Sequence, residues 1–494
     1  MDTRILKHGA PVRLFPVYPE SCKEQRSISI VLAAMVSVRP FAEKILTPLG
    51  AKVGKRSLVS AFTEVTLVNE VKGLKDRPDA LLVVETGKNS WSALIEAKIG
   101  KNSVESAQLE RYIELAKLNN IDAVITITNE LTPAPSIHPT QLAKSILRNQ
   151  SLYHLSWSSI LTIAFLLAAA KENPFDNDDE AYIVSELIRY LEHAGSGRLP
   201  LDQMNQGWPK IVSDVQAGHP INGRSEEVSD MITTWHQEAR DIALIMTRKL
   251  KEAVTLAVTR NQIADREGWV ESETKNFCEA KVLSFDLDVP NAASRIFVEA
   301  DFLRRAVRVS MKLAAPADKV SNAAKLNWLL RQLQKSDLSH IIIRCVTRGK
   351  GQNFGAMAKD IDPKADEIKN LADIASFHVE MSCDLGAKFN SRKKFVEGIE
   401  ELVPRYYMNV GQHLQAWVAP PPKLTKEMAD DATENIEASP EASDSPISNS
   451  ELRREQQERP DWAKAWQSEP TISDAEEVSP KYPAPPAQTP RSPG

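Results

Sequence analysis

The spacing of apolar residues predicts a mixed α/β fold for the first part of the chain. Residues 28–38 carry an apolar stripe at helical spacing, and Pro40 begins a second helical piece. Residues 104–118 also fit a helix, and residues 122–128 have the apolar, β-branched composition of a strand buried on both faces. Three strand-like runs separated by polar turns lie between the helices: 61–68, 78–84 and 91–99. The predicted order is therefore α-β-β-β-α-β.

The pattern changes twice further along the chain. Residues 141–262 are mostly helical, with amphipathic stretches at 151–171 and 180–194 and a candidate long helix at 226–259. After residue 280 the pattern alternates again. The strands predicted there are 282–289, 294–302, 306–313, 339–347 and 376–383, and the helices are 317–335 and 392–402. This alternation predicts a second domain of the α+β class.

The last part of the chain has a different composition. It begins with three consecutive prolines and is rich in serine, proline and acidic residues, so it cannot bury enough apolar surface to offset its ordering entropy. Within it, Trp462 and Trp466 would share one helical face, and they are equally well interpreted as a protein-binding motif or as a chance island. Four segments follow from these changes: an α/β domain at 1–135, a helical region at 136–265, an α+β domain of unknown role at 266–418 and a disordered acidic tail at 419–494.

Charge and cysteine usage exclude several classes of protein. The 494 residues carry a formal net charge of -5, but the acidic tail accounts for that sign and leaves the rest mildly basic. The four cysteines are far apart and form no C-x2-C pair, which argues against a structural zinc site and a disulfide framework. The longest apolar run, residues 160–170, is too short to span a bilayer, and no secretory signal is visible. We therefore expect a cytoplasmic protein with no membrane partner.

Candidate chemistry is concentrated in the first domain. Asp79 opens the second predicted strand, and Glu96 and Lys98 lie two residues apart on the third, so their side chains share one face. If the two strands form a hairpin, Asp79 can lie beside Glu96. Two neighbouring carboxylates repel each other unless a cation lies between them. Hard oxygen ligands with open positions suit Mg²⁺ or Mn²⁺.

Those three side chains suit phosphodiester hydrolysis. A divalent ion can polarise a phosphodiester and lower the pKa of a bound water. Lys98, beside such an ion, can orient the water or offset charge on the phosphorus. Each residue also has a structural interpretation: Asp79 as a turn residue, and Glu96 with Lys98 as an ion pair on a solvated strand. The apolar neighbours of Glu96 favour the catalytic interpretation over the ion pair on a solvated strand, because unpaired charge is costly among them.

The same residues resemble a known family. Pro78-Asp79 followed, after a 16-residue gap, by Glu96-Ala97-Lys98 is similar to the motif of the PD-(D/E)XK nuclease superfamily. Gln108 and Tyr112 look like the Q-x-x-x-Y element of its RecB-like branch. The resemblance covers about residues 20–130. It implies an α/β fold with a restriction-endonuclease-like αβββαβ core.

The resemblance also assigns roles to residues. Asp79, Glu96 and the backbone carbonyl of Ala97 are the expected metal ligands, with Mg²⁺ as cofactor and Mn²⁺ as a substitute. The first helix of the family usually supplies another acid, for which Glu24 is the candidate and Glu64 on the first strand is the rival. Gln108 and Tyr112 would contact the substrate or order the site, as their counterparts do in that family.

These expectations describe a Mg²⁺-dependent deoxyribonuclease acting in genome defence or DNA repair. DNA is favoured because the resembled superfamily mostly cuts DNA, while RNA as substrate and assembly into homo-oligomers stay open. Two alternatives also stay open: a catalytically inactive nucleic-acid-binding module, and a protein-interaction scaffold with a vestigial nuclease fold. Lys101 and the glycine-rich run 348–355 are phosphate-binding candidates or plain surface. A Walker A loop, a G-x-S-x-G elbow and an H-E-x-x-H motif are all missing from the sequence.

Overall fold

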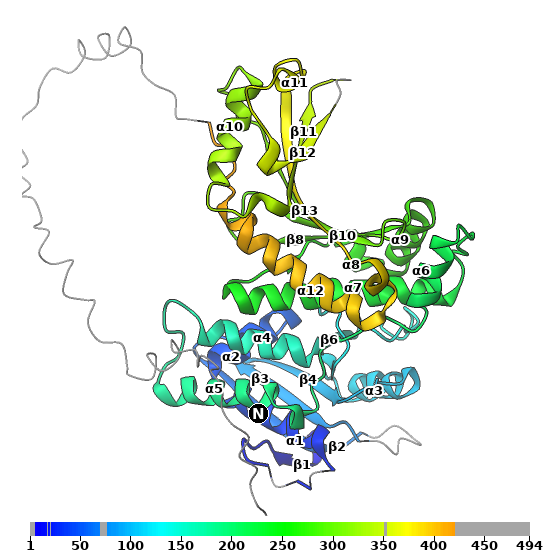
Figure 1. Ribbon diagram of the computed structural model, residues 1–494. Coiled ribbons are helices and arrows are strands. Elements are labelled where there is room, and N and C mark those ends of the chain that lie inside the picture. Colours follow the sequence, from blue (N-terminus) through cyan, green and yellow to red (C-terminus); the bar gives the residue numbers. More distant parts are fainter. Residues whose placement is uncertain (1–4, 17, 20, 70–76, 350–352, 420–494) are drawn as a thin grey trace, which may run out of the picture. The chain divides into compact units, whose positions relative to one another are not determined.

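The computed structural model describes residues 5–16, 18–19, 21–69, 77–349 and 353–419, all of which belong to one compact unit (Figure 1). This part of the chain is mixed α/β and contains two sheets. No helix in the described ranges is both long and apolar enough to cross a membrane. The proposed tail motif at Trp462 and Trp466, like residues 420–494 in general, lies outside the described residues.

The first sheet has six strands in the order β1-β2-β3-β4-β5-β6. Neighbours from β1 to β4 are antiparallel, whereas β4, β5 and β6 run parallel. Gly87 and Lys88 join β3 to β4, and Gly87 takes a φ of +64°, which glycine adopts at little cost. The strands are β1 (Leu6–Pro11), β2 (Ser57–Leu67), β3 (Ala80–Thr86), β4 (Asn89–Ala97), β5 (Ala123–Thr128) and β6 (Ser151–Ser156).

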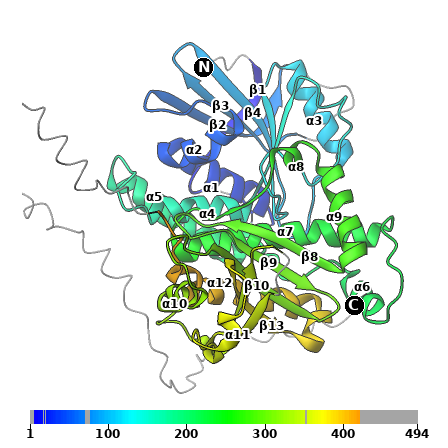
Figure 2. The same cartoon turned by 90° about the horizontal axis from the view of Figure 1, so that it is seen from above.

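Helices cover both faces of this sheet (Figure 2). Side chains alternate along β4, so that Ile95 enters the core on one face and Leu94 enters the core on the other. The Leu94 face is covered by α3 (Ser106–Leu118). The helices on the Ile95 face are α1 (Lys23–Ser37), α2 (Arg39–Leu46), α4 (Trp157–Ala168) and α5 (Asp178–Glu192). The result is a three-layer α/β/α arrangement.

The second sheet is antiparallel throughout, in the order β12-β11-β13-β10-β9-β8-β7. Its strands alternate buried and less buried residues, so one face packs on a helical layer that includes α7 (Glu226–Leu250) and α12 (Arg392–Asn409). The strands are β7 (Thr255–Leu256), β8 (Val282–Asp288), β9 (Ile296–Asp301), β10 (Ala306–Ala314), β11 (Ile341–Thr347), β12 (Phe354–Met357) and β13 (Ile374–Asp384).

The remaining helices complete this second layer. Helix α7 packs against α4 on the side of the first sheet and against α12 on the side of the second. One helix therefore contributes to the burial of both halves of the unit. The others are α6 (Trp208–Gln216), α8 (Arg260–Ala264), α9 (Arg266–Ala280), α10 (Asn322–Gln332) and α11 (Asp366–Lys369).

Several elements differ from those predicted, and β1, β7, β12 and α9 were not predicted at all. Residues 151–156, predicted as helical, form strand β6, because they pair in parallel with β5. Helix α7 ends at Leu250 rather than at residue 259, because the next residue, Lys251, takes a left-handed φ of +57°. Helix α12 continues beyond residue 402 and through Pro404, because the buried Tyr406 anchors it with a 2.8 Å hydrogen bond to the carbonyl of Val379. The first sheet thus extends past residue 135, where the sequence placed the end of its domain.

Candidate active site

Asp79 and Glu96 lie opposite each other across the β3–β4 hairpin. Ala80 pairs with Ile95, so one step further along the register brings Asp79 to Glu96. Asp79 directly precedes β3, and its Oδ2 accepts a 2.8 Å hydrogen bond from the backbone N–H of Ala97. This bond ties the start of one strand to the end of the other. The hairpin therefore brings the two predicted metal ligands together.

Glu96 is almost completely buried, with 2% of its surface exposed. Its Oε1 accepts hydrogen bonds from Lys98 Nζ at 2.6 Å and from Gln108 Nε2 at 3.0 Å. Its Oε2 is buried and has no hydrogen-bond partner among the described residues. A buried carboxylate oxygen without a donor is costly, so the site has an acceptor ready for a cation or a water.

Lys98 directly follows β4, and its main chain is held on both sides. Its N–H donates to the carbonyl of Ile127 at 2.8 Å, which prolongs the ladder between β4 and β5. Its carbonyl accepts a 2.8 Å hydrogen bond from the indole Nε1 of Trp157. Its Nζ lies 3.9 Å from Glu24 Oε2, in addition to the close contact with Glu96. The ammonium thus lies between two carboxylates.

Helix α3 brings Gln108 and Tyr112 to the same carboxylate. The two residues are one turn apart, and Gln108 Nε2 also donates to Tyr112 Oη at 3.0 Å. The hydroxyl of the buried Tyr112 donates to the carbonyl of Arg77 at 3.1 Å, two residues before Asp79. The pair therefore links Glu96 to the segment that carries Asp79. These contacts suit the site-ordering role, and the substrate-binding role of the two residues stays a prediction.

The two candidates for an additional acid are placed differently. Glu24, in the first turn of α1, accepts hydrogen bonds on Oε1 from Ile99 N at 3.3 Å and from Asn102 Nδ2 at 3.4 Å. Glu64 is exposed and takes a φ of +53° where β2 bulges against β1. Its backbone N–H donates to the carbonyl of Asp79 at 3.0 Å, but its carboxylate contacts none of the site residues described. The geometry therefore favours Glu24.

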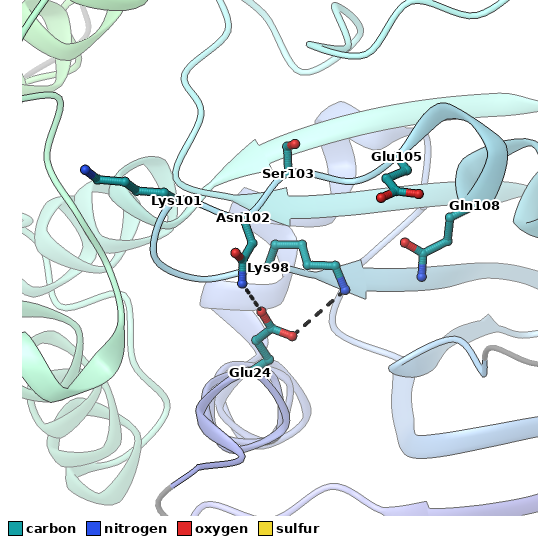
Figure 3. Close-up of a pocket in the computed structure, with 7 residues that line it drawn as sticks. All are labelled: Glu24, Lys98, Lys101, Asn102, Ser103, Glu105 and Gln108. Carbon is teal, nitrogen blue, oxygen red and sulfur yellow. Dashed lines mark hydrogen bonds and ion pairs between the residues drawn. The ribbon is translucent and has the colours of Figure 1, made fainter.

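An open pocket of about 480 Å³ lies beside these residues (Figure 3). Glu24, Lys98 and Gln108 form part of its wall, and the loop after Lys98 forms the rest. Lys101, in that loop, is exposed, points away from Glu24 and has no ion pair with a described residue. The complete lining is Glu24, Lys98, Lys101, Asn102, Ser103, Glu105 and Gln108. A polar, open pocket with a free cation at its rim can accept an anionic ligand.

Burial raises the pKa values of the two acids Asp79 and Glu96, and charge repulsion adds to the shift at Asp79. Burial, followed by the charge of Glu96, raises the pKa of Asp79 to about 7. Burial also raises the pKa of Glu96, although Lys98, Tyr112 and Gln108 act in the opposite direction. Burial lowers the pKa of Lys98, but the hydrogen bond and charge of Glu96 outweigh it, so the net pKa is raised and the ammonium stays protonated. The carboxylates are crowded, and an added cation would relieve that repulsion.

The donor set fits a hard divalent ion that is shared with solvent and substrate. Among the residues that the structure describes, no group of three or more His, Cys, Asp or Glu side chains forms a metal centre by itself. Mg²⁺ does not require one, because it usually binds one or two carboxylates and completes its shell with water and phosphate oxygens. Asp79 and the unpartnered Oε2 of Glu96 suit that mode. The carbonyl of Ala97, at the end of β4, stays a predicted ligand.

The sequence analysis did not identify two residues of the site. Asn102 bonds Glu24 from the loop after Lys98, and inspection of that loop could have suggested it. Trp157 reaches Lys98 from the start of α4, a segment that carries no motif. Comparison with protein-family models, curated proteins and solved structures finds no match for this chain. The candidate site is therefore supported by its geometry and by the motif residues themselves.

Two histidines, His154 on β6 and His138 in the loop before it, lie beyond the β5 residue that pairs with Glu96. Thr126 of β5 pairs with Glu96, and its Oγ1 lies 2.8 Å from Nε2 of His138 and 2.9 Å from Nδ1 of His154. Burial lowers the pKa of His138 to about 4 and that of His154 to about 3. Both imidazoles are therefore neutral at pH 7. In the described part of the chain, neither histidine belongs to a group of three or more potential metal ligands.

Replacement of His138 should reveal this buried neutral state. The unfolded chain binds a proton on His138 near pH 6.5 and the folded chain only near pH 4, so acid favours unfolding between these values. The stability advantage of the wild type over His138→Gln should shrink by up to about 1.4 kcal/mol per pH unit as the pH falls through this window. Urea unfolding at several pH values measures it. His219→Gln, at an exposed histidine, is the control, and an advantage independent of pH contradicts the prediction.

Proposed function

We propose that this protein is a Mg²⁺-dependent nuclease that hydrolyses phosphodiester bonds in DNA. The observation that carries the proposal is the arrangement around Glu96: Asp79 lies across the hairpin, Lys98 Nζ is 2.6 Å from Oε1, and Oε2 has no partner among the described residues. Two acids and one ammonium converge beside an open polar pocket. Phosphoryl transfer is a chemistry that uses that combination, with a metal ion on the acids and the ammonium on the developing charge.

The order of elements supports the same proposal. Helix α1, strands β2, β3 and β4, helix α3 and strand β5 follow the αβββαβ order of the resembled PD-(D/E)XK superfamily, with α2 inserted after α1. The motif residues lie where that order requires them, at the start of β3, at the end of β4 and on α3. The restriction-endonuclease-like core, and the assignment to the superfamily, are part of this proposal.

Each residue receives a role in the proposed reaction. Asp79 and Glu96, with the carbonyl of Ala97, would hold Mg²⁺, or Mn²⁺ in its place. When bound, the ion supplies Lewis-acid polarisation of the phosphate and a lower pKa for an attacking water. The protonated Lys98 orients the water and balances the charge that develops on the phosphate oxygens. Gln108 and Tyr112 hold the carboxylate of Glu96 in place.

The choice of DNA as substrate and the biological role come from the resemblance to the superfamily and not from the geometry of the site. The resembled superfamily mostly cuts DNA, which favours DNA over RNA, and a role in genome defence or DNA repair suits such an activity. The pocket beside the acids is open to solvent, as a site that takes a polymer backbone requires. The carboxylates alone would repel a phosphate, so Lys98 and the exposed Lys101 supply the attraction.

Replacement of Lys98 tests catalysis. We expect Lys98→Met to cut labelled single-stranded DNA, duplex DNA and RNA at least about 100-fold more slowly than the wild type in Mg²⁺, because it removes a charge aimed at the transition state. Urea unfolding of Lys98→Met, compared with the wild type, controls for misfolding. Lys88→Met, in the turn at the other end of β4, is the matched control and should cut normally.

The outcomes of this digestion separate the candidate functions. Cleavage that is equal in Lys98→Met and wild type contradicts the assignment of Lys98. Binding without cleavage, unchanged by a chelator, indicates an inactive nucleic-acid-binding module, and the absence of binding indicates a scaffold. Ca²⁺ in place of Mg²⁺ should permit binding and slow cleavage, because its coordination is looser.

Replacement of Lys101 tests substrate binding independently of cleavage. If a phosphate of the substrate lies against this cation, Lys101→Ala should weaken DNA binding in Ca²⁺ and lower the slope of log K against log salt by about 0.7 to 0.9. The measurement is a fluorescence titration at several salt concentrations. Lys88→Ala is the matched control. An unchanged slope would place the phosphate backbone elsewhere on the surface.

A further inference from the structure

The loop that follows Lys98 connects two parts of the proposed site. The backbone N–H of Ile99 and the amide of Asn102 both donate to Glu24 of α1. Between them Gly100 takes a φ of +64°, and the N–H of Asn102 bonds back to the carbonyl of Ile99 at 3.3 Å. The position of this loop therefore determines where Glu24 and Lys98 lie relative to each other. What holds the loop is thus relevant to the chemistry.

Asn129 holds this loop from the end of β5. Its Nδ2 donates to the carbonyl of Gly100 and to the carbonyl of Gly197, both at 2.9 Å. Its Oδ1 accepts a 2.9 Å hydrogen bond from the backbone N–H of Leu199. One amide side chain thus uses both of its N–H donors and its carbonyl oxygen to join two backbone segments.

Gly197 allows the two segments to approach closely. The N–H of Gly100 donates to its carbonyl at 3.0 Å. Gly197 has a φ of +82°, and a Cβ at this position would lie 2.7 Å from Cδ1 of Ile99. The carbonyl of the preceding Ser196 accepts a 2.9 Å hydrogen bond from Ser27 Oγ, one turn after Glu24 on α1. The segment therefore touches both the helix of Glu24 and the loop after Lys98.

From these contacts we propose that Asn129 is a positioning residue for cleavage, which acts with Gly197 to hold the loop after Lys98. The inference rests on the proposed nuclease function. The hydrogen-bond partners of the Asn129 side chain among the described residues are Gly100, Gly197 and Leu199, and do not include Asp79, Glu96 or Lys98. Asn129 would therefore act through the backbone of Gly100. A displacement of about 1 Å at a catalytic group can reduce the rate about 100-fold without loss of binding. The expected signature is therefore a fall in kcat with little change in KM.

Asn119 supplies a matched control for the loss of the hydrogen bonds that Asn129 makes. It lies after α3 and makes an equivalent set of bonds: Nδ2 donates to Asn69 O and Leu115 O, both at 2.9 Å, and Oδ1 accepts from Asn69 N at 3.3 Å. None of these partners belongs to the proposed site. Asn129→Ala and Asn119→Ala should both lower the stability, but only Asn129→Ala should lower kcat, by about 10-fold to 100-fold.

Hydrogen exchange on the full chain gives a readout that does not need activity. Asn129→Ala should speed exchange in residues 99–102, whereas Asn119→Ala should leave these amides as they are in the wild type. Gly197→Ala, which pushes against Ile99, should reproduce both the faster exchange and the lower kcat. It also serves if Asn129→Ala does not fold.

The two readouts keep this inference separate from the proposed function. If the wild type does not cut nucleic acid, the nuclease proposal fails, while the exchange result still tests whether Asn129 holds the loop. If the wild type cuts, the positioning role is overturned when Asn129→Ala keeps the wild-type kcat, or when both asparagine variants lose kcat equally. Unchanged exchange in residues 99–102 of Asn129→Ala overturns it as well.

Discussion

The register of the β3–β4 hairpin is the constraint on which the proposed site depends. Because the two-residue turn at Gly87 and Lys88 fixes the pairing, Asp79 comes opposite Glu96, and Lys98 shares its face. A slip of one residue would turn Glu96 toward the opposite core. Burial by helices on both faces makes such a slip costly, since each layer accepts only apolar side chains of the matching set. The chemistry is thus specified by the packing of residues that take no part in it.

The same packing creates an electrostatic problem that the site solves incompletely. Burial raises the pKa values of Asp79 and Glu96, and the single ammonium of Lys98 contacts only one oxygen of Glu96 at close range. Gln108 on α3 donates to that same oxygen, so Oε2 is left without a partner among the described residues. Stability alone would favour a neutral side chain at this position. A buried acid with one unpartnered oxygen next to an open pocket is the pattern expected where binding of a cation and an anion completes the structure.

The parts of the site that are local in sequence could be predicted, and the parts that depend on distant contacts could not. Strand alternation and a short turn sufficed to bring Asp79, Glu96 and Lys98 together. The choice between Glu24 and Glu64 required coordinates, because a bulge with a left-handed residue leaves Glu64 exposed. Strand β6 was hidden because it precedes α4 without a break, and its pairing with β5 is a tertiary effect. The hydrogen bonds that Asn129 makes to Gly100, Gly197 and Leu199 follow no periodicity and no motif, so a single sequence does not predict them.

The contacts around Gly197 join residues that are far apart in the sequence, which constrains the order in which they can form during synthesis. Ser27 and Ser196 are separated by 169 residues along the chain, yet their contact joins the first helix to the segment that holds the loop after Lys98. Such distant pairings form late, because a large loop must be closed before any contact rewards it. Until the residues around Gly197 have been synthesised, the loop after Lys98 cannot make its contacts with them. The loop after Lys98 can therefore be held by Asn129 and Gly197 together only after the segment that ends at Leu199 has emerged.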